Sequence, residues 1–307
     1  MIDMSNCIWK YVPESIHQAY GEIKFWIRFH FFKKGLLSEE FRGLMGYDIN
    51  WKNPRDINEK INWLKLNSDT TEWTRLADKY LVRKYVKEKI GEQYLTKLYG
   101  VWNIVEDIDF KILPNRFIFK TNHGAGTVLP VLSKNNVDKQ EIRKKLKAWL
   151  KLKYGYKTIE PHYLRIKPLI IAEELLENDA EFSSSLVDYK IYCMDGVPEL
   201  ILVCADRQIG KHCHFSYFDT NWNPLPDILN TGLKGTHIDY PRPDCLQELL
   251  ICASKLSKGF PQVRVDFYIV KGKPIFGEMT FTSNGGYDND ITRDYSIELG
   301  NKIKLQI

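Results

Sequence analysis

Two turn signals late in the chain restrict its fold most. In DYKIYCMDGVPELILV, residues 188–203, Asp195-Gly196 separates two runs rich in β-branched and aromatic residues, the strongest short hairpin signal in the sequence. A second hairpin is expected in VRVDFYIVKGKPIFGEMTF, residues 263–281. Hairpins join antiparallel strands. We therefore expect an α+β fold with mainly antiparallel sheets, not the alternating pattern of a doubly wound fold.

The first third of the chain is predicted to be helical. Ser38-Glu39-Glu40 is expected to open a short helix, and Asp56 with Glu59 three residues later has the pattern of a capping box. Apolar residues near helical spacing, among them Tyr80, predict one continuous helix over residues 73–90.

The middle of the chain is predicted to be richer in strands. RFIFK (residues 116–120), TVLPVL (127–132) and KPLIIAEELLE (167–177) are expected to be strands or to contain them. DKQEIRKKLKAWLKLKYG (138–155) is predicted to be a basic amphipathic helix. Its charges are typical of a solvated face, because no regular aromatic spacing of the kind used on nucleic acids accompanies them.

Length and composition limit the class of protein. The 307 residues suffice for one large domain or two moderate ones, and the net charge of +5 favours an anionic ligand without indicating nucleic acid. Six scattered cysteines without a CxxC pair, and no signal peptide, predict reduced thiols and a cytoplasmic location. Lys211-His212-Cys213-His214 lacks a second ligand cluster at usable spacing, which argues against a zinc site.

One segment suggests a membrane contact. No apolar run approaches the ~20 residues that cross a bilayer. In KFWIRFHFFKKG, residues 24–35, lysines and an arginine flank aromatic residues. This pattern is typical of an interfacial helix and equally of a helix packed on a neighbouring domain. Weak association with the inner face of a membrane is therefore one of two open alternatives.

The second hairpin carries two acids whose geometry depends on its loop. If Val270 and Pro274 close a three-residue loop, Asp266 and Glu278 lie directly opposite each other, with Cβ atoms about 4.5–5.5 Å apart. A two-residue loop would put them on opposite faces. The paired arrangement predicts a hard divalent cation between them, best Mg²⁺, since like charges there are otherwise destabilising. The alternative is two unrelated carboxylates.

Lysines and a glycine-rich loop suggest an anion site. Lys120 leads from its strand into His123-Gly124-Ala125-Gly126, whose small residues let backbone N–H groups approach an anion. The loop has neither the GxxxxGK[ST] nor the GxGxxG pattern. His123 either donates to a phosphate oxygen or is a plain loop histidine. Lys79, taken alone, reads as an exposed lysine on the predicted helix.

Further polar residues extend this set. Glu173 and Glu174 after a buried apolar run suggest that something binds there, such as an adenine amino group with the backbone of Leu175 and Leu176 as hinge. Lys190 and Arg207 are expected to face the same cleft if the sheets stack. Arg207 either grips a carboxylate or phosphate bidentately or pairs with a neighbouring acid such as Asp206.

The order of these motifs resembles the ATP-grasp superfamily and, within it, the TupA-like branch named for teichuronopeptide biosynthesis. The resemblance covers roughly residues 51–303. It is carried by NPRDINEKINWLKL, ADKYLVRKYV, LPNRFIFKTNHGAG, IAEELLE, DYKIYCMDGVPELI and KGFPQVRVDFYIVKGKPIFGEMTF. It implies two α+β subdomains that clasp ATP. The expected layout is a helical segment over residues 1–70 and an ATP-grasp domain over 71–307, with a smaller subdomain at about 116–182 and a larger one at 183–307.

The resemblance also implies roles for individual residues. Lys79 and Lys120 match lysines that contact nucleotide phosphates, with Gly124 to Thr127 as a flexible loop over them. Glu173 matches the acid at the adenine hinge. Together with the residues discussed above, the full set of expected site residues is Lys79, Lys120, His123, Gly124, Gly126, Glu173, Glu174, Leu176 and Lys190 for ATP; Asp266, Glu278 and Asn284 for Mg²⁺; Arg207, Arg264 and Gly285 for substrate; and Arg264 and Lys120 for catalysis.

One position departs from the family pattern. Many ATP-grasp enzymes have Glu-x-Asn for the metal, whereas Thr280 stands in the Asn place here. Asn284, from the following loop, is expected to replace the missing Asn as a metal ligand. Whether the site binds a second metal ion is left open.

The implied activity is ATP-dependent ligation. A carboxylate, activated as an acyl phosphate, is joined to an amine, in the setting of cell-surface or capsular polysaccharide. A glycosyltransferase of the same setting is the alternative within enzymes, and a non-catalytic assembly partner is a third possibility. ATP, a carboxylate and an amine are the expected partners, and no nucleic acid is expected.

Overall fold

The computed structural model describes residues 26–156, 158–207, 214–233 and 236–305, in two compact units, residues 1–49 and 50–307. In the first unit, residues 26–31 are helical and helix α3 spans Lys33–Met45. The expected helix start at Ser38 is wrong. The Ser38 hydroxyl donates to the carbonyl oxygen of Lys34 (2.8 Å) from within the helix instead of capping it.

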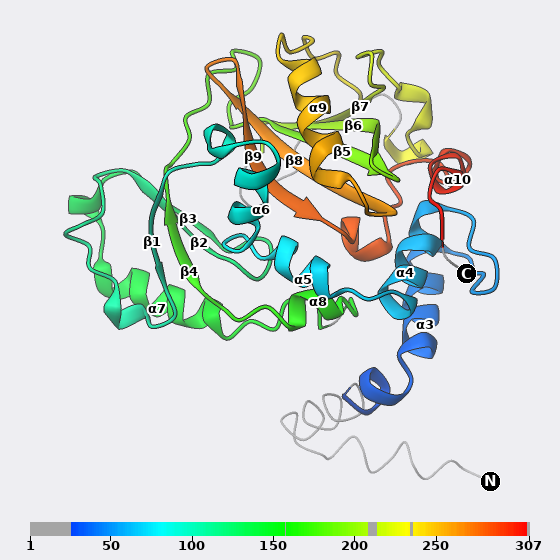
Figure 1. Cartoon of the computed structure of the whole chain (residues 1–307), viewed down its shortest axis with the longest axis horizontal. Coiled ribbons are helices and arrows are strands. Elements are labelled where there is room, and N and C mark those ends of the chain that lie inside the picture. The colour runs from blue at the N-terminus through cyan, green and yellow to red at the C-terminus, as the bar shows by residue number, and fades with distance from the viewer. Residues whose placement is uncertain (1–25, 157, 208–213, 234–235, 306–307) are drawn as a thin grey trace. The chain divides into compact units, whose positions relative to one another are not determined.

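The larger unit contains two sheets, and every strand pair in them is antiparallel (Figure 1). The four-stranded sheet has the order β1 (Leu98–Trp102), β4 (Ile170–Glu173), β2 (Phe117–Thr121), β3 (Val128–Val131). The five-stranded sheet has the order β7 (His214–Phe218), β6 (Val197–Ala205), β5 (Asp188–Met194), β8 (Gln262–Val270), β9 (Lys273–Thr280). The α+β class with mainly antiparallel sheets is confirmed.

Helices surround these sheets. The α-helices of the larger unit are α4 (Ile57–Asn67), α5 (Thr71–Ala77), α6 (Val82–Lys89), α7 (Lys139–Leu150), α8 (Pro161–Leu164), α9 (Leu246–Ser257) and α10 (Arg293–Asn301). Short 3-10 turns are η2 (Glu92–Tyr94), η3 (Val105–Asp107), η4 (Lys134–Asn136), η5 (Pro226–Ile228), η6 (Thr231–Leu233) and η7 (Ser283–Gly286). Within the described residues, every helix is too short or too polar to span a bilayer.

The five-stranded sheet is covered on both faces. Ile191 and Val265 face the cluster that includes Leu249 of α9, which lies across the sheet in Figure 1, while Leu200 faces the cluster of α4 and α10. Cover on both sides leaves all of β5 buried, including its charged residues Asp188 and Lys190. The four-stranded sheet buries Phe117, among others, in a separate cluster with α7.

The capping box that begins α4 is confirmed. The Asp56 carboxylate accepts from the backbone N–H of Glu59 (2.9 Å), and the Glu59 carboxylate accepts from the backbone N–H of Asp56 (3.2 Å). Helix α4 belongs to the larger unit. The domain boundaries expected at residues 70 and 182 stay predictions.

The first predicted hairpin is confirmed. Asp195 and Gly196 form its turn between β5 and β6 with φ of 52° and 81°. Both values are positive, as a two-residue turn that matches the strand twist requires.

The second predicted hairpin is present, but its loop length and strand register differ from those expected. Val270 pairs with Lys273, so the loop has two residues and the three-residue closure is wrong. Left uncorrected, this register would place Asp266 opposite Gly277. A β-bulge at this point shifts the pairing by one residue, and Asp266 pairs with Glu278.

Glycine at position 277 permits the bulge. A Cβ atom there would lie 3.0 Å from the carbonyl oxygen of Asp266, closer than nearly all real Cβ contacts. The cross-strand pair of acids predicted from the sequence therefore exists, and the bulge rather than the loop length creates it.

The predicted helix over residues 73–90 is interrupted. Helix α5 ends at Ala77 and α6 begins at Val82, because one oxygen of the Asp78 carboxylate accepts from the backbone N–H groups of Tyr80 (2.8 Å) and Leu81 (3.1 Å). Tyr80, expected on the apolar face, is 37% exposed. Lys79 lies in this break, where its backbone N–H donates to the carbonyl of Asn122 (3.1 Å).

Helix α8 carries a histidine that gives the fold a pH dependence. His162 is fully buried beside Trp73 and Phe281, and burial lowers its pKa to about 3. Neither ring nitrogen has a hydrogen-bond partner among the described residues. Below the unfolded pKa of about 6.5 the unfolded chain takes up this proton while the folded chain stays neutral, so stability falls as pH falls.

His162→Phe should remove this dependence. Between pH 7.5 and 5.5 the parent should lose about 1.4 kcal/mol more unfolding free energy than the variant. Urea unfolding at both pH values measures the difference. Equal losses in the two proteins would show that His162 does not titrate in this way.

Candidate functional site

A cavity of about 680 Å³ brings most of the predicted site residues together. We call it the central cavity. Its walls come from the Lys79 break, β2 and the loop after it, α7, and strands β5, β8 and β9. The predicted site residues that line it are Lys79, Lys120, Gly124, Gly126, Lys190, Arg207, Asp266 and Glu278.

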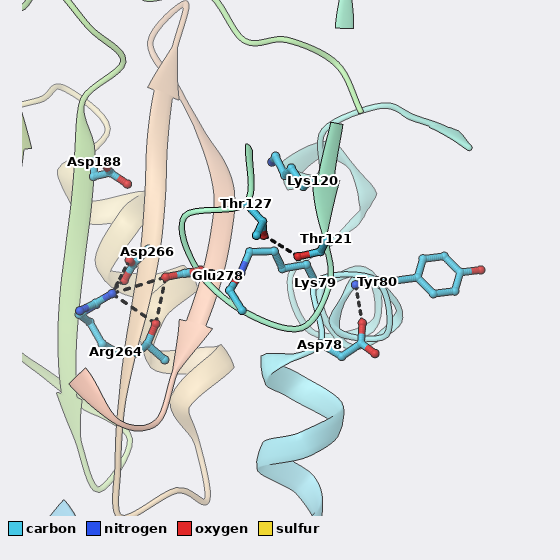
Figure 2. Close-up of polar contacts among 12 residues, drawn as sticks. Asp78, Lys79, Tyr80, Lys120, Thr121, Thr127, Asp188, Arg264, Asp266 and Glu278 are labelled. Carbon is cyan, nitrogen blue, oxygen red and sulfur yellow. Dashed lines mark hydrogen bonds and ion pairs between the residues drawn. The ribbon is translucent and has the colours of Figure 1, made fainter. Parts of the chain in front are cut away.

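The paired acids are surrounded by cations (Figure 2). Asp266 accepts two hydrogen bonds from Arg264, at 2.7 and 2.8 Å, and forms an ion pair with Lys190 at 2.6 Å. Glu278 pairs with Lys79 at 3.1 Å and lies 3.6 Å from Arg264. In Figure 2, Lys79 extends toward Glu278 while Tyr80 points away from it.

Burial makes these charges depend on one another. Asp266 is 2% exposed and Lys190 is 8% exposed. Burial alone would raise the pKa of Glu278, but the neighbouring cations, first Lys79 and then Lys190, hold it below its usual value. Burial alone would lower the pKa of Lys190, but Asp266 and Asp188 raise it overall. Both groups therefore stay charged at neutral pH.

Asp188 is a site residue that the sequence reasoning missed. It is buried, lies 3.3 Å from the Lys190 amine and pairs with Arg207 at 3.1 Å. Arg207 thus does pair with a neighbouring acid, although Asp206 is not the acid: the Asp206 carboxylate accepts from the backbone N–H of Ser184 (2.7 Å). The signal was available, because residues two apart on a strand share a face.

Lys120 extends toward the end of strand β4. Its amine pairs with one oxygen of Glu173 (2.8 Å), and Arg83 pairs with the other (2.8 Å). Arg83 was also missed, although it follows Lys79 by four residues. Glu173 is 5% exposed and, with Glu174 and Leu176, is not among the residues that line the central cavity. The adenine-hinge assignment of these three stays a prediction.

The glycine-rich loop is closed at its base and held by Lys79. The Thr121 and Thr127 hydroxyls are hydrogen-bonded to each other, and the Lys79 amine donates to the carbonyl of Gly124 (2.8 Å). The His123 ring is not among the groups that line the central cavity. Its Nε2 lies 3.1 Å from the carbonyl of Leu152, and burial lowers its pKa.

A second cavity, of about 640 Å³, brings together three further predicted residues, Arg264, Asn284 and Gly285. We call it the tyrosine cavity. Arg264, Glu278, Asn284 and Gly285 line it, together with Ala125, Lys153, Tyr154, Gly155, Tyr156, Thr158, Glu160, Tyr163, Thr280 and Thr282. Glu278 and Ala125 line both cavities, so the two cavities adjoin at Glu278.

Asp266 and Glu278 suit a magnesium ion. The described residues contain no group of three or more His, Cys, Asp or Glu placed to hold a metal. Two carboxylates are enough for Mg²⁺ when phosphate oxygens and water complete the shell. The Thr280 hydroxyl is already engaged, since it donates to Glu278 (3.2 Å) and accepts from Arg264 (3.3 Å). The role of Asn284 as a ligand of the metal stays a prediction.

Two sequence features fall partly outside the described residues. Of the 24–35 segment, residues 24 and 25 lie outside them, and so does all of Lys211-His212-Cys213-His214 except His214 on β7.

Solved structures resemble this chain only distantly. The D-alanine–D-alanine ligase from Bacillus anthracis complexed with ATP is 16% identical over 75% of this chain and 65% of its own, with a TM-score of 0.43. The L-amino acid ligase from Bacillus licheniformis is 15% identical over 75% and 49%, with a TM-score of 0.40. The ligase PsnB complexed with minimal precursor, Mg and ADP is 14% identical over 80% and 66%, with a TM-score of 0.38. These likenesses are too weak to support conclusions about activity, and no curated protein matches the chain.

A family model gives a firmer result. The model described as TupA-like ATPgrasp matches residues 59–304, which contain every strand described here and both cavities. The chain therefore belongs to the TupA-like ATP-grasp family and has the ATP-grasp fold.

Proposed function

We propose that the protein is an ATP-dependent ligase that joins a carboxylate to an amine through an acyl phosphate. One observation supports this above the others: Lys79, Lys120, Asp266 and Glu278 line a single cavity. The proposal needs a cationic environment for a triphosphate and an acidic pair for its metal ion in one place.

Different residues of the central cavity would bind the phosphates and the metal ion of Mg²⁺-ATP. Lys79, Lys120 and Lys190 would pair with phosphate oxygens, and the backbone N–H groups of the Gly124–Thr127 loop would approach them closely. Asp266 and Glu278 would hold Mg²⁺, which neutralises charge on the transferred phosphoryl group when bound. A phosphate arriving beside Lys79 would compete for the amine that now pairs with Glu278.

The chain itself provides positioning rather than a nucleophile. The substrate carboxylate would attack the terminal phosphorus of ATP, with Arg264 orienting it. An amine would then attack the acyl phosphate and release phosphate, while the glycine-rich loop excludes water from the activated acyl group. No Ser-His-Asp or Cys-His arrangement is needed for this chemistry.

The setting we propose is the assembly of a cell-surface or capsular polysaccharide, in the cytoplasm and beside the membrane. The exposed side chains of Trp26, Phe31 and Phe32 support a membrane contact. Replacing all three by serine should then abolish sedimentation with anionic vesicles. Equal sedimentation of parent and variant would remove this segment from the proposal.

Two other functions make different predictions. A glycosyltransferase would use the acidic pair for a nucleotide sugar and release a UDP-type product, and a non-catalytic assembly partner would neither bind nor hydrolyse ATP. The lysines grouped around one cavity favour ATP over both. Product analysis with Mg²⁺ and either ATP or UDP-sugars separates the three.

The experiment that tests the proposal is a carboxylate screen. Amino acids and uronic acids are offered with ATP and Mg²⁺, and ADP release is measured with hydroxylamine present to trap the acyl phosphate as a hydroxamate. A carboxylate that stimulates both signals together supports the ligase. Release of ADP without any hydroxamate, or release of UDP, would contradict it.

Lys120→Ala should weaken ATP binding about 10- to 100-fold, the value of one charge-assisted hydrogen bond. Glu173 keeps Arg83 as a partner, so the fold should persist. Calorimetric titration with ATP and Mg²⁺ measures the change, and Lys84→Ala on the exposed face of α6 is the control. A dissociation constant equal to the parent's would remove Lys120 from the site.

A further inference from the structure

Glu160 is a buried acid in the tyrosine cavity with no role in the proposal so far. It is 4% exposed, and both of its oxygens are hydrogen-bonded to hydroxyls, those of Thr158 and Thr282. None of the ion pairs in the described part of the chain includes it. A buried carboxylate usually has a cationic partner, because hydroxyl donors alone offset its loss of water poorly. A cationic ligand would provide that partner.

Two tyrosines line this cavity together with Glu160 and the metal-side acid Glu278. Tyr154 and Tyr163 meet edge to face with centroids 4.9 Å apart. Burial raises the pKa of each tyrosine hydroxyl, and the negative charges of Glu160 and Glu278 raise it further. Both tyrosines therefore lie within electrostatic range of both carboxylates. Tyrosine faces beside a carboxylate are a typical environment for an ammonium group.

Tyr154 also links this cavity to the glycine-rich loop. A Cβ atom at Gly124 would lie 2.7 Å from the Tyr154 ring, so the ring packs directly on that loop. A group bound against Tyr154 would therefore lie next to the loop that lines the central cavity. This is where an acyl phosphate formed at the central cavity would meet its attacking group.

The backbone that presents Glu160 is strained. Ile159 is buried and has φ of 50°, a value that a β-branched residue rarely adopts. Residues strained in this way gather at binding and catalytic sites. The turn is fixed by the backbone N–H of Glu160, which donates to the carbonyl of Gly155 (2.8 Å).

We propose that the tyrosine cavity is the acceptor site and that Glu160 binds the ammonium group of the amine substrate and takes one of its protons. This rests on the ligase function proposed above. One N–H proton of the ammonium passes to a Glu160 oxygen. The freed lone pair forms the C–N bond to the acyl carbon, and the C–O bond to phosphate breaks with its electron pair leaving on phosphate. The second proton of the nitrogen leaves with that phosphate.

A ratio of two products tests this proposal. With the carboxylate found by the screen, each protein is given either hydroxylamine, which is uncharged near neutral pH, or a panel of primary ammonium compounds: glucosamine, lysine, alanine and glutamate. Glu160→Gln should lower the ratio of amide to hydroxamate about 100-fold. Glu177→Gln, at an exposed ion pair, is the matched control and should leave the ratio at the parent's value.

Three further readouts separate binding from a structural effect. The defect of Glu160→Gln should appear mainly as a raised KM for the amine. It should shrink as the pH approaches the pKa of that amine, where the acceptor is neutral without help. Thr282→Val, which removes one hydroxyl from Glu160, should lower the ratio three- to tenfold and carries the test if Glu160→Gln does not fold.

The outcomes distinguish this inference from the function beneath it. A ratio for Glu160→Gln within threefold of the parent's would overturn the role of Glu160. Hydroxamate but no amide from the parent with any ammonium compound would overturn the amine acceptor site while the acyl phosphate stands. No hydroxamate from the parent would overturn the proposed function, and the acceptor site with it.

Discussion

Asp266→Asn should lower Mg²⁺-dependent ATP turnover by at least about a thousandfold, and Glu278→Gln should do the same. Each change replaces an anionic oxygen ligand by a neutral amide, and metal stabilisation of a phosphoryl transition state contributes several kcal/mol. The fold should survive at reduced stability, because both new side chains match the volume of the old ones and Lys190 keeps Asp188 as a buried acidic partner after Asp266→Asn.

The measurement is ADP release over a range of Mg²⁺ concentrations, beside thermal unfolding of each variant. Glu177→Gln, at an exposed ion pair on the surface, is a charge-matched control that should turn over like the parent. If both variants keep the parent's rate at every Mg²⁺ concentration, Asp266 and Glu278 do not hold the metal.

Lys190→Met should destabilise the protein by about 3 kcal/mol. The amine of Lys190 lies between Asp188 and Asp266, all three are buried, and removing one partner of a buried ion pair leaves uncompensated charge. Arg264 still pairs with Asp266, which places the expected cost at the lower end of the range for such a loss.

Urea unfolding at neutral pH measures the effect of Lys190→Met. Lys302→Met is the control. Lys302 pairs with Glu199 at 2.6 Å on the surface, where an ion pair is worth at most about 1 kcal/mol. Equal losses from the two substitutions would show that the Lys190 cluster is no stronger than a surface pair.

Sequence patterns predicted the local turn and the helix cap correctly, but they predicted the cross-strand pairing of the second hairpin for the wrong reason. The Asp195-Gly196 turn and the Asp56 capping box depend on residues near each other in the chain, so local propensity was sufficient. The pairing of Asp266 with Glu278 was predicted on a loop length that is wrong. A single bulge at Gly277 restores the register, and such bulges have no reliable signature beyond a glycine in a strand.

Tertiary contacts decide the rest of the site. The break at Asp78 is stabilised in part by Asn122, which is 44 residues away and donates to the Asp78 carboxylate (2.9 Å). A periodic apolar pattern across residues 73–90 gives no sign of it. Arg83 pairs with Glu173, which lies 90 residues later in the chain, so the sequence around either residue does not show this contact.

Glu160 shows most clearly what local sequence patterns cannot predict. In the sequence it stands in TIEPHYLRIK, a stretch without periodicity or a known phosphate motif. Its burial arises because the loop that contains Thr282 packs against it from more than a hundred residues away. No local pattern encodes that contact.

A crystal structure with Mg²⁺ and a non-hydrolysable ATP analogue tests the central claim most directly. We expect one metal ion within about 2.0–2.1 Å of oxygens from both Asp266 and Glu278, with phosphates of the same nucleotide against the amines of Lys79 and Lys120. A nucleotide found outside the central cavity, or a metal ion that touches neither acid, would contradict it.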